Sequence, residues 1–339
     1  MTTSRRTPDR RATSADVARA AGVSRATVSY VLNATPNQSI PDATRDRVRA
    51  AADRLGYIPS AHGRALRQGL GETVLVLEPD WMPSSTSARL WSSLSTSLAE
   101  VGLVCVFSHT AGVATSLRQV LTTFVPRLVL SFVPLSEDDA ELLATQSVPL
   151  LRLDVGNGGR GGDHLELDEH IGRAQVEHLV TAGRRKLAFL DLVDERARAQ
   201  STARAAGAGA AAGAAARQGV TLERLDFDFT SEFVGTAVHR ILDGGFDGVC
   251  CFNDDVALVA LSRLQDAGSR VPDDVAVVGA DDLPVGAFTS PPLTTVSLDN
   301  ERIGRYLALS VAAAAGLDSA SEPDRDAAAR VHVIHRGSS

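Results

Sequence analysis

The stretch DVARAAGVSRATVSYVLN, residues 16–33, carries its apolar side chains in two short groups separated by a glycine. Val17 and Ala21 are four residues apart and therefore share one face of a helix. Val28 and Val31 are three residues apart and share a face of a second helix. This spacing predicts two short helices with a break between them.

Gly22 lies at that break, where a sharp turn needs a residue that adopts a positive φ at little cost. Ser24 follows in a position suited to capping the second helix, and Ala18 is small enough for the two helices to approach closely. The stretch is therefore predicted to form a helix-turn-helix.

A third helix is predicted to complete a core that two short helices cannot form alone. Pro41 and Asp42 open this helix, and Gly56 ends it. Its apolar stripe is expected to consist of Val48, Ala51, Ala52 and Leu55.

The charge distribution indicates a polyanion as the partner of this region. The 339-residue chain has a net charge of −7, but residues 1–70 carry 12 arginines against 5 aspartates, a net of +7, which leaves −14 for the remainder. A basic head on an acidic body is typical of a nucleic-acid-binding module joined to another domain. Residues 1–12 are expected to form a disordered basic tail, but such a tail does not explain the residues after them, where the helical pattern begins.

Two interpretations of the three helices differ in function. They could form a small bundle without a ligand, or the second helix could enter the major groove of DNA. The basic charge favours DNA binding, with some side chains reading bases and others holding phosphates. The predicted DNA-binding residues are Ser24, Arg25, Ala26, Thr27, Ser29, Tyr30 and Asn33, together with Thr13 and Ser14.

DVARAAGVSRATVSYVLN and the later segment TRDRVRAAADRLGYIPSAHGRALRQG resemble the headpiece and hinge of the lactose-repressor (LacI/GalR) family of bacterial transcription regulators. Farther along, HRILDGGFDGVCCFNDDVALVALSRLQDAGSRVPDDVAVVGADD and PPLTTVSLDNERIG are similar to that family's effector-binding core. The resemblance implies a DNA-binding headpiece at residues 13–58, a hinge at 59–70, and a two-lobed effector-binding and dimerisation core at 71–339.

In this family the hinge forms a short helix on the operator, and a leucine from each subunit of the dimer opens the minor groove. The resemblance assigns Ser60, Gly63 and Leu66 to the hinge and places Leu66 at the wedge. Gly63 stands where the family usually has alanine, which costs helix stability of about 1 kcal/mol. Tyr30 stands where the family commonly has arginine, so a different base preference is expected.

After Gly71, short continuous apolar runs alternate with segments of helical length. Continuous runs indicate strands buried on both faces, hence parallel sheets covered by helices. The expected fold is a small all-α headpiece plus an α/β core of two doubly wound, parallel-sheet lobes, and the resemblance implies a periplasmic-binding-protein-like core. Chain crossovers between the lobes are expected near residues 154–168 and 291–300. The predicted strands are Val74–Leu77, Leu103–Phe107, Leu128–Phe132, Pro149–Asp154, Leu187–Asp191, Val249–Phe252, Val275–Val278 and Val331–His335.

Ligands of open α/β sheets bind beyond the carboxyl ends of the strands. Polar residues at such ends are Asp80, Asp154, Asn253, Asp254, Asp281 and Asp282, and for any single one a structural cap is as plausible as a ligand contact. The resemblance selects Arg204, Asn253 and Asp281 as effector-binding residues, with Asp154 and Asp80 as weaker candidates. In relatives the matching arginine binds hydroxyl or carboxylate groups.

Several segments depart from the family pattern. PDWMPSST, residues 79–86, lacks the usual asparagine and aromatic pair, the segment after Arg204 lacks the usual large apolar residue, and Leu298 stands where sugar-binding relatives often have a polar residue. Together these departures argue against a pentose or hexose effector without excluding one. Trp81, Met82 and Phe229 could line the ligand cleft or serve ordinary packing. The alanine-rich run at residues 204–217 predicts one tightly packed helix that approaches a sheet closely.

Other classes of protein are disfavoured. GNGGRGG, residues 156–162, contains G-x-G-x-x-G but is better interpreted as a surface loop, because no helix opens at its third glycine. Nucleophile, P-loop and zinc-protease motifs are absent, so no catalytic residue, metal or cofactor is expected. The three cysteines lie in apolar runs and are expected to be buried thiols.

No signal peptide precedes the basic helices, which disfavours an exported solute-binding protein of the same core fold. No apolar run is long enough to span a membrane, so a cytoplasmic protein is expected. The favoured function is a homodimeric transcription regulator, most simply a repressor, that binds a pseudo-palindromic operator and a small-molecule effector. A solute-binding protein or a ligand-independent regulator is the alternative.

Overall fold

The computed structural model describes residues 12–32, 39–57, 71–78, 85–109, 117–133, 135–153, 167–317, 323–324 and 330–339. The chain divides into two compact units, Met1–Glu72 and Thr73–Ser339, which we call the headpiece and the core domain. Among the described residues, no helix is both long and apolar enough to cross a membrane.

The headpiece contains three helices, α1 (Ser14–Ala21), α2 (Arg25–Leu32) and α3 (Asp42–Leu55). Gly22 ends α1 in a left-handed conformation with a φ of 67°, as expected of the sharp turn. The buried residues are Val17, Ala18, Ala21, Val28, Val31, Val48, Ala51 and Ala52. Because this core draws on all three helices, the predicted helix-turn-helix with a third supporting helix is confirmed.

The predicted apolar stripe of α3 is wrong at Leu55, whose side chain is 38% exposed. The helix has 14 residues, whereas α1 and α2 have 8 each. Leu55 is the last residue of α3 and does not join the buried headpiece core.

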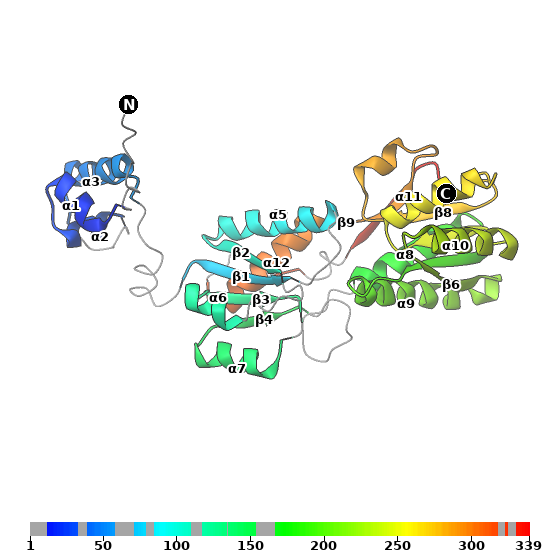
Figure 1. Ribbon diagram of the computed structural model, residues 1–339, viewed down its shortest axis with the longest axis horizontal. Helices are drawn as coiled ribbons and strands as arrows, with labels where there is room; N and C mark the ends of the chain where they lie inside the picture. Colours follow the sequence, from blue (N-terminus) through cyan, green and yellow to red (C-terminus); the bar gives the residue numbers. More distant parts are fainter. Residues whose placement is uncertain are drawn as a thin grey trace, which may run out of the picture. The chain divides into compact units, whose positions relative to one another are not determined.

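The first lobe of the core domain is a parallel four-stranded sheet in the order β2-β1-β3-β4, with helices on both faces (Figure 1). Alternate residues of β1 face the two layers: Val74 and Val76 pack with α5 and α12, and Leu75 and Leu77 pack with α6 and α7. The elements are β1 (Thr73–Glu78), β2 (Val104–His109), β3 (Leu128–Ser131), β4 (Leu150–Arg152), α5 (Ser85–Glu100), α6 (Leu117–Thr123), α7 (Glu137–Thr145) and α12 (Asn300–Ala314).

The second lobe is a six-stranded sheet in the order β10-β9-β8-β7-β5-β6, parallel except for β10. Its strands are β5 (Lys186–Leu192), β6 (Thr221–Phe227), β7 (Gly248–Cys251), β8 (Ala276–Ala280), β9 (Thr294–Leu298) and β10 (Val331–Ile334). Its helices are α8 (Leu167–Thr181), α9 (Arg198–Ala214), α10 (Ser231–Gly244) and α11 (Asp254–Asp266), with 3-10 turns η1 (Ala216–Gln218) and η2 (Pro284–Phe288).

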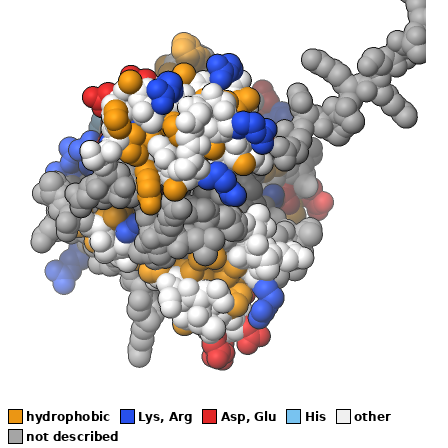
Figure 2. Space-filling view, turned by 90° about the vertical axis from the view of Figure 1, so that its left-hand side faces the viewer, with side chains coloured by type: hydrophobic (Ala, Val, Ile, Leu, Met, Phe, Trp, Pro, Cys, Tyr) orange, Lys and Arg blue, Asp and Glu red, His pale blue; other side chains and the backbone are white. Residues whose placement is uncertain are grey.

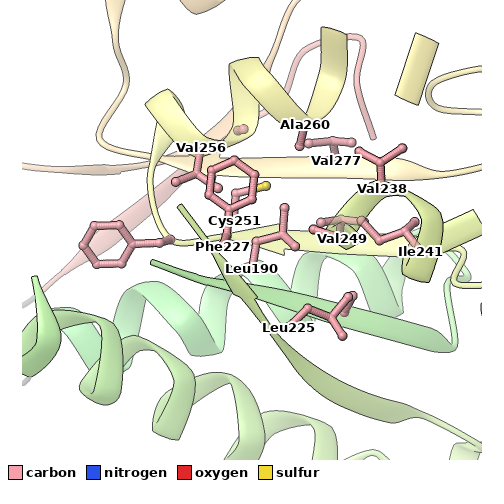
Figure 3. Packing of buried hydrophobic residues seen from close by; sticks show 14 of the residues in the cluster. Leu190, Leu225, Phe227, Val238, Ile241, Val249, Cys251, Val256, Ala260 and Val277 are labelled. Carbon is pink, nitrogen blue, oxygen red and sulfur yellow. The ribbon is translucent and has the colours of Figure 1, made fainter. Parts of the chain in front are cut away.

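Two aliphatic cores cover the faces of this second sheet. Helices α10 and α11 pack on one face, where Cys251 and Val277 meet Val238 and Val256 (Figure 3). Helices α8 and α9 pack on the other face, which receives Cys250. The neighbouring cysteines of β7 therefore point to opposite sides of the sheet, and both are free thiols.

The first predicted crossover between the lobes is confirmed, because the chain leaves the first sheet after β4 and enters the second lobe at α8. The second predicted crossover is also confirmed, because the chain leaves β9 and begins α12 within residues 291–300. Residues 294–298 form β9, an interior strand of the second sheet, and the return to the first lobe occurs at Asp299, where α12 begins. The strands β6 and β9 were not predicted because both are rich in polar residues, TLERLDF and TTVSL.

The alanine-rich run forms the helix α9 as far as Ala214 and continues into the 3-10 turn η1. The helix packs on the second sheet, as predicted, and it also makes a close contact with the helix α8 that was not predicted. A Cβ atom at Gly207 would lie 2.0 Å from the carbonyl oxygen of Glu169, and one at Gly172 would lie 1.8 Å from that of Arg204. These glycines let the backbones of α8 and α9 touch. The contact brings the start of α8 next to Arg204.

Candidate functional site

The exposed surface of α2 begins at a capped turn. The Oγ of Ser24 accepts a hydrogen bond from the Thr27 N–H at 3.0 Å and lies 2.9 Å from the Thr27 Oγ1, so Ser24 caps the helix as predicted. Arg25 and Ala26 are exposed. Thr27, Ser29 and Tyr30 are half-buried, while Val28 and Val31 face the core.

The residues before α1 are fixed by a capping box. The backbone N–H and the Oγ1 of Thr13 both donate to Asp16 Oδ2, at 3.0 and 2.6 Å, and the Asp16 N–H donates to Thr13 Oγ1 at 3.4 Å. Ser14 begins α1 and is half-buried. The capping box thus fixes the backbone at the start of α1, where the predicted phosphate contacts lie.

Figure 2 shows Lys and Arg side chains on the surface of the face that it draws. In the headpiece, Arg19, Arg25, Arg47, Arg49 and Arg54 are exposed. The surface can therefore place several positive charges against a polyanion.

Some predicted site residues lie outside the described residues. These are Asn33 of the headpiece, Ser60, Gly63 and Leu66 of the hinge, and Asp80, Trp81, Met82, Asp154 and the G-x-G-x-x-G segment of the core domain.

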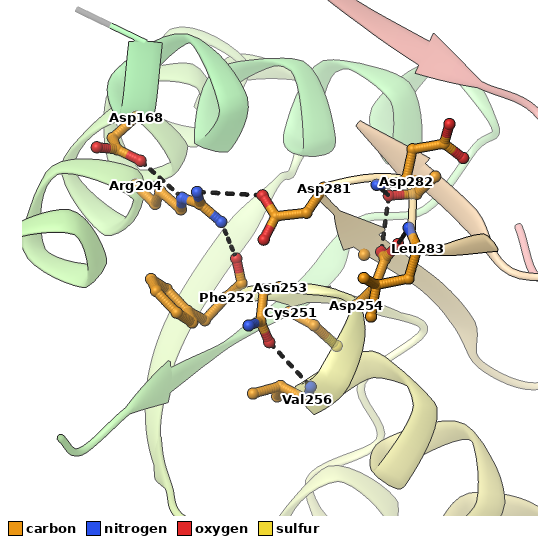
Figure 4. Close-up of polar contacts among 12 residues, drawn as sticks. Asp168, Arg204, Cys251, Phe252, Asn253, Asp254, Val256, Asp281, Asp282 and Leu283 are labelled. Atoms are coloured by element: carbon orange, nitrogen blue, oxygen red, sulfur yellow. Dashed lines mark hydrogen bonds and ion pairs between the residues drawn. The ribbon is translucent and has the colours of Figure 1, made fainter. Parts of the chain in front are cut away.

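In the core domain, Arg204 is the centre of a buried polar cluster at the carboxyl ends of the second sheet (Figure 4). Its Nε donates to Asp168 Oδ1 at 2.8 Å, its Nη1 to the Phe252 carbonyl oxygen at 2.6 Å, and its Nη2 to Asp281 Oδ1 at 3.4 Å. The guanidinium also stacks on the Phe252 ring, 4.8 Å from its centroid. All three guanidinium nitrogens are thus engaged.

Burial and charge act against each other in this cluster. Burial opposes the charge of Arg204, but the carboxylates of Asp281 and Asp168 raise its pKa overall, so the guanidinium stays protonated. Burial also raises the pKa of Asp281, against the attraction of Arg204. With two carboxylates on one cation, the cluster carries an excess of negative charge when ionised.

Asn253 is 6% exposed and caps α11, since its Oδ1 accepts a hydrogen bond from the Val256 N–H at 3.0 Å. The side-chain oxygen of Asn253 therefore serves as a structural helix cap, which was the alternative to a ligand contact. Phe229 is 47% exposed and meets Phe227 edge to face at 5.7 Å, beyond the end of β6.

Sequence reasoning missed one member of the cluster, Asp168, and one residue that supports it, Asp254. In the sequence Asp168 marks only the start of a helix, yet in the structure it binds Arg204 from the first turn of α8. Asp254 stands at a strand end but was not selected, yet it is fully buried and contacts the segment that carries Asp281. The signal available for Asp254 was the pair of polar residues, Asn253 and Asp254, that follows the wholly apolar strand β7 and Phe252.

The cysteines have the character of buried structural thiols. Cys250 and Cys251 are fully buried, and burial raises the pKa of both. Cys105 differs from the prediction because it is only half-buried, on the edge strand β2, and burial raises its pKa to about 11. In the part of the chain that the structure describes, no group of three or more His, Cys, Asp or Glu residues could hold a metal ion.

Comparisons with known proteins agree with both units. Residues 13–60 match the family described as "Bacterial regulatory proteins, lacI family", and residues 176–339 match a "Periplasmic binding protein-like domain". The chain is 30% identical over 303 residues to the HTH-type transcriptional repressor PurR of Vibrio campbellii, with 87% of this chain and 89% of the relative covered. PurR of Photobacterium profundum is 29% identical over 308 residues, with the same coverage.

Solved structures show the same architecture. A lac repressor dimer bound to operator and the anti-inducer ONPF superposes with a TM-score of 0.75 at 25% identity, covering 97% of this chain and 99% of the other. A complex of the transcriptional regulator CelR with cellobiose gives a TM-score of 0.61 at 26% identity, covering 97% and 100%. The chain therefore belongs to the LacI family of bacterial regulatory proteins, with a helix-turn-helix headpiece and a periplasmic-binding-protein-like core domain.

Proposed function

We propose that this protein is a cytoplasmic, homodimeric transcription repressor that binds a pseudo-palindromic operator and responds to a small molecule bound by its core domain. The observation that carries this proposal is the joining, in one chain, of an exposed, arginine-rich helix-turn-helix to a core domain with a buried, charged cluster at its strand ends. Buried charged groups at such a position are costly, and they favour a ligand-binding role over a purely structural one.

On the DNA side, α2 enters the major groove, with Arg25, Ala26, Ser29 and Tyr30 facing base edges. Thr13, Ser14, Ser24, Thr27 and Asn33 contact the backbone on either side, and the paired hinges with Leu66 open the central minor groove. The two-fold symmetry of the dimer then requires two half-sites in inverted orientation.

On the effector side, the geometry favours a neutral or cationic molecule rich in hydrogen-bond donors. Arg204 already contacts Asp168, Asp281 and the Phe252 carbonyl, so it offers little to an anion. The Asp281 carboxylate, held at the edge of the cluster, is an acceptor for ligand hydroxyl or amino groups. A phosphate or free carboxylate would meet the excess negative charge of the cluster.

The test has two steps. Selection of operator sequences from a random DNA library by the full chain is expected to yield an inverted repeat, and a library without such enrichment would contradict the proposal. A thermal-shift screen of metabolites is then expected to raise the melting temperature with neutral or cationic compounds, since ligand binding stabilises the native state.

The variants Arg204→Ala and Asp281→Ala are then expected to bind the selected operator but to lose the response to the compound found. A matched control is Arg224→Ala, a surface arginine of β6 that pairs with Asp191 away from the cluster. A normal response in the Asp281 variant would show that the effector binds elsewhere. If no compound shifts the melting temperature while the operator is bound, the protein is a ligand-independent regulator.

A further inference from the structure

Asp254, the first residue of α11, is completely buried, and both of its carboxylate oxygens are used. Its Oδ2 accepts a hydrogen bond from the backbone N–H of Leu283 at 2.7 Å. Its Oδ1 accepts one from the Thr295 Oγ1 at 2.7 Å. Asp254 thus connects α11 to the segment after β8 and to the neighbouring strand β9 (Figure 4).

The segment after β8 has an unfavourable backbone conformation. Asp281 and Asp282 have φ values of 100° and 51°, a region that residues other than glycine rarely adopt. Two such residues in succession persist only when surrounding contacts hold them. These contacts determine where the Asp281 carboxylate lies.

Three successive backbone N–H groups of this segment are each held by a specific acceptor. The Asp281 N–H donates to the Val296 carbonyl oxygen at 2.8 Å, and the Asp282 N–H donates to Thr295 Oγ1 at 3.3 Å. The Leu283 N–H donates to Asp254. Because Thr295 also donates to Asp254, the one carboxylate supports two of these three contacts.

The space for this carboxylate depends on a glycine. A Cβ atom at Gly279 would lie 2.0 Å from Asp254 Oδ1, closer than any real contact, and 3.3 Å from the Cβ of Ala257. Gly279 on β8 therefore leaves room that the Asp254 side chain fills. The aspartate and the glycine form a matched pair.

We propose that Asp254 is a positioning residue for the effector site: through Leu283 and Thr295 it holds the strained turn at Asp281–Asp282 so that the Asp281 carboxylate lies against Arg204. The inference rests on the proposed function of the Arg204–Asp281 cluster. Asp254 itself does not contact Arg204 in any of the hydrogen bonds that the arginine makes among the described residues. It acts through the backbone that carries Asp281.

The experiment uses the full-length protein without a ligand and compares Asp254→Ala with Asp254→Asn. Hydrogen exchange by mass spectrometry reports on peptides covering residues 281–293, with a β5 peptide, residues 186–192, as the internal reference. The Nε–Hε resonance of Arg204 in NMR spectra reports on its ion pairs with Asp168 and Asp281.

In Asp254→Ala, exchange in residues 281–293 is expected to become at least 10-fold faster while the β5 peptide is unchanged, and the Arg204 resonance is expected to shift. Asp254→Asn is expected to restore both signals. An asparagine oxygen still accepts from Leu283, and its amide group can donate to Thr295. Unchanged exchange and an unchanged resonance in Asp254→Ala would overturn the proposal, and so would equally faster exchange in both peptides.

Gly279→Ala provides an independent test. In the otherwise native chain its methyl group would displace the Asp254 carboxylate and reproduce the faster exchange at 281–293. In the double variant with Asp254→Ala the methyl group has room, so exchange is expected to be no faster than in Asp254→Ala alone. If the double variant exchanged faster than Asp254→Ala by the same factor as Gly279→Ala exchanges faster than the native chain, the matched-pair arrangement would be contradicted.

These measurements need neither an effector nor DNA, so their failure would be distinct from a failure of the proposed function. Operator binding at 25 °C is expected to be unchanged in Asp254→Asn. For any compound found in the thermal-shift screen, Asp254→Ala is expected to weaken binding at least 10-fold, and unchanged affinity would overturn the positioning role.

Discussion

Tyr30 of the predicted DNA-binding surface stands where the family resemblance leads us to expect an arginine. It is half-buried on α2, one residue before the buried Val31. A tyrosine offers one hydroxyl and an apolar ring, whereas an arginine offers two parallel donors that suit guanine.

Tyr30→Arg is therefore expected to shift the base preference at one position of each half-site toward guanine, by about 1–3 kcal/mol. Operator selection with both proteins measures this change, and circular dichroism checks that the helical content is retained. Ala50→Ser, at an exposed position of α3 outside the set of base-facing residues, is a control that should leave the preference unchanged. Identical selected sites for the native chain and the Tyr30→Arg variant would show that residue 30 does not read bases.

Asp254 makes the stability of the core domain depend on pH in an unusual direction. Burial raises its pKa from 3.8 to about 7, against the hydrogen bonds from Thr295 and Leu283 and with help from the charges of Asp281 and Asp282. Between these two values the folded state binds more protons than the unfolded state. The free energy of unfolding therefore falls as pH rises through this window.

Replacing Asp254 with asparagine removes this titration. In the native chain the free energy of unfolding is expected to be lower at pH 8 than at pH 5 because of Asp254. In Asp254→Asn this decrease is expected to be smaller by up to a few kcal/mol. Urea titrations at pH 5 and 8 measure it, and Asp226→Asn on β6 is a control on the same sheet. Equal pH dependence in the native chain and in Asp254→Asn would contradict the raised pKa.

Among the elements, the pair α8 and α9 shows how far a local pattern determines packing. The helical nature of the alanine-rich run followed from composition, because alanine favours helices. Its packing on the second sheet was predicted too, but its close contact with α8 was not, because small side chains fit against a sheet or a helix equally well. The contact is decided by Glu169 and Gly207, which lie far apart in the sequence and meet only in the folded chain.

Two glycines of α9 give a direct test of this packing. Gly207→Ala is expected to lower the free energy of unfolding by about 1–3 kcal/mol, since its Cβ would overlap the Glu169 backbone. Gly209→Ala meets nothing within 4 Å and is expected to raise it by about 0.5–1 kcal/mol. Thermal and urea unfolding measure both, and a Gly207→Ala protein as stable as the native chain would mean that α8 and α9 pack less closely.

The strands and the site residues could likewise be predicted only where a local sequence pattern or the family resemblance marked them. Uniformly apolar strands such as β7 and β8 were recognisable, while β9 was not, because its buried Thr294 and Thr295 look like loop residues until their hydroxyls are seen to have partners. Arg204 and Asp281 were predicted through family resemblance. Asp168 and Asp254 required the structure, since ordinary capping positions explain both in the sequence.

At the scale of the whole molecule, the division of charge separates the two functions. The net charge of +7 lies in residues 1–70 and the net charge of −14 in the rest, so only the headpiece and hinge region attract DNA. A dimer brings two such basic regions to one operator. Each phosphate that an arginine neutralises releases counterions, which makes binding weaken as salt rises.

Operator affinity of the full-length protein is therefore expected to fall by roughly 10³–10⁵-fold between 50 and 200 mM KCl, if the dimer neutralises about 6–10 phosphates. Fluorescence anisotropy with a labelled operator measures the slope of log affinity against log salt. Arg47→Gln removes an exposed headpiece charge and should reduce the slope by about one for each phosphate that is no longer neutralised. Arg270→Gln removes an exposed charge of the core domain, paired with Asp274, and should leave the slope unchanged. Equal reductions in the two variants would show that DNA binding extends onto the acidic core domain, against the separation of roles that the charge pattern predicts.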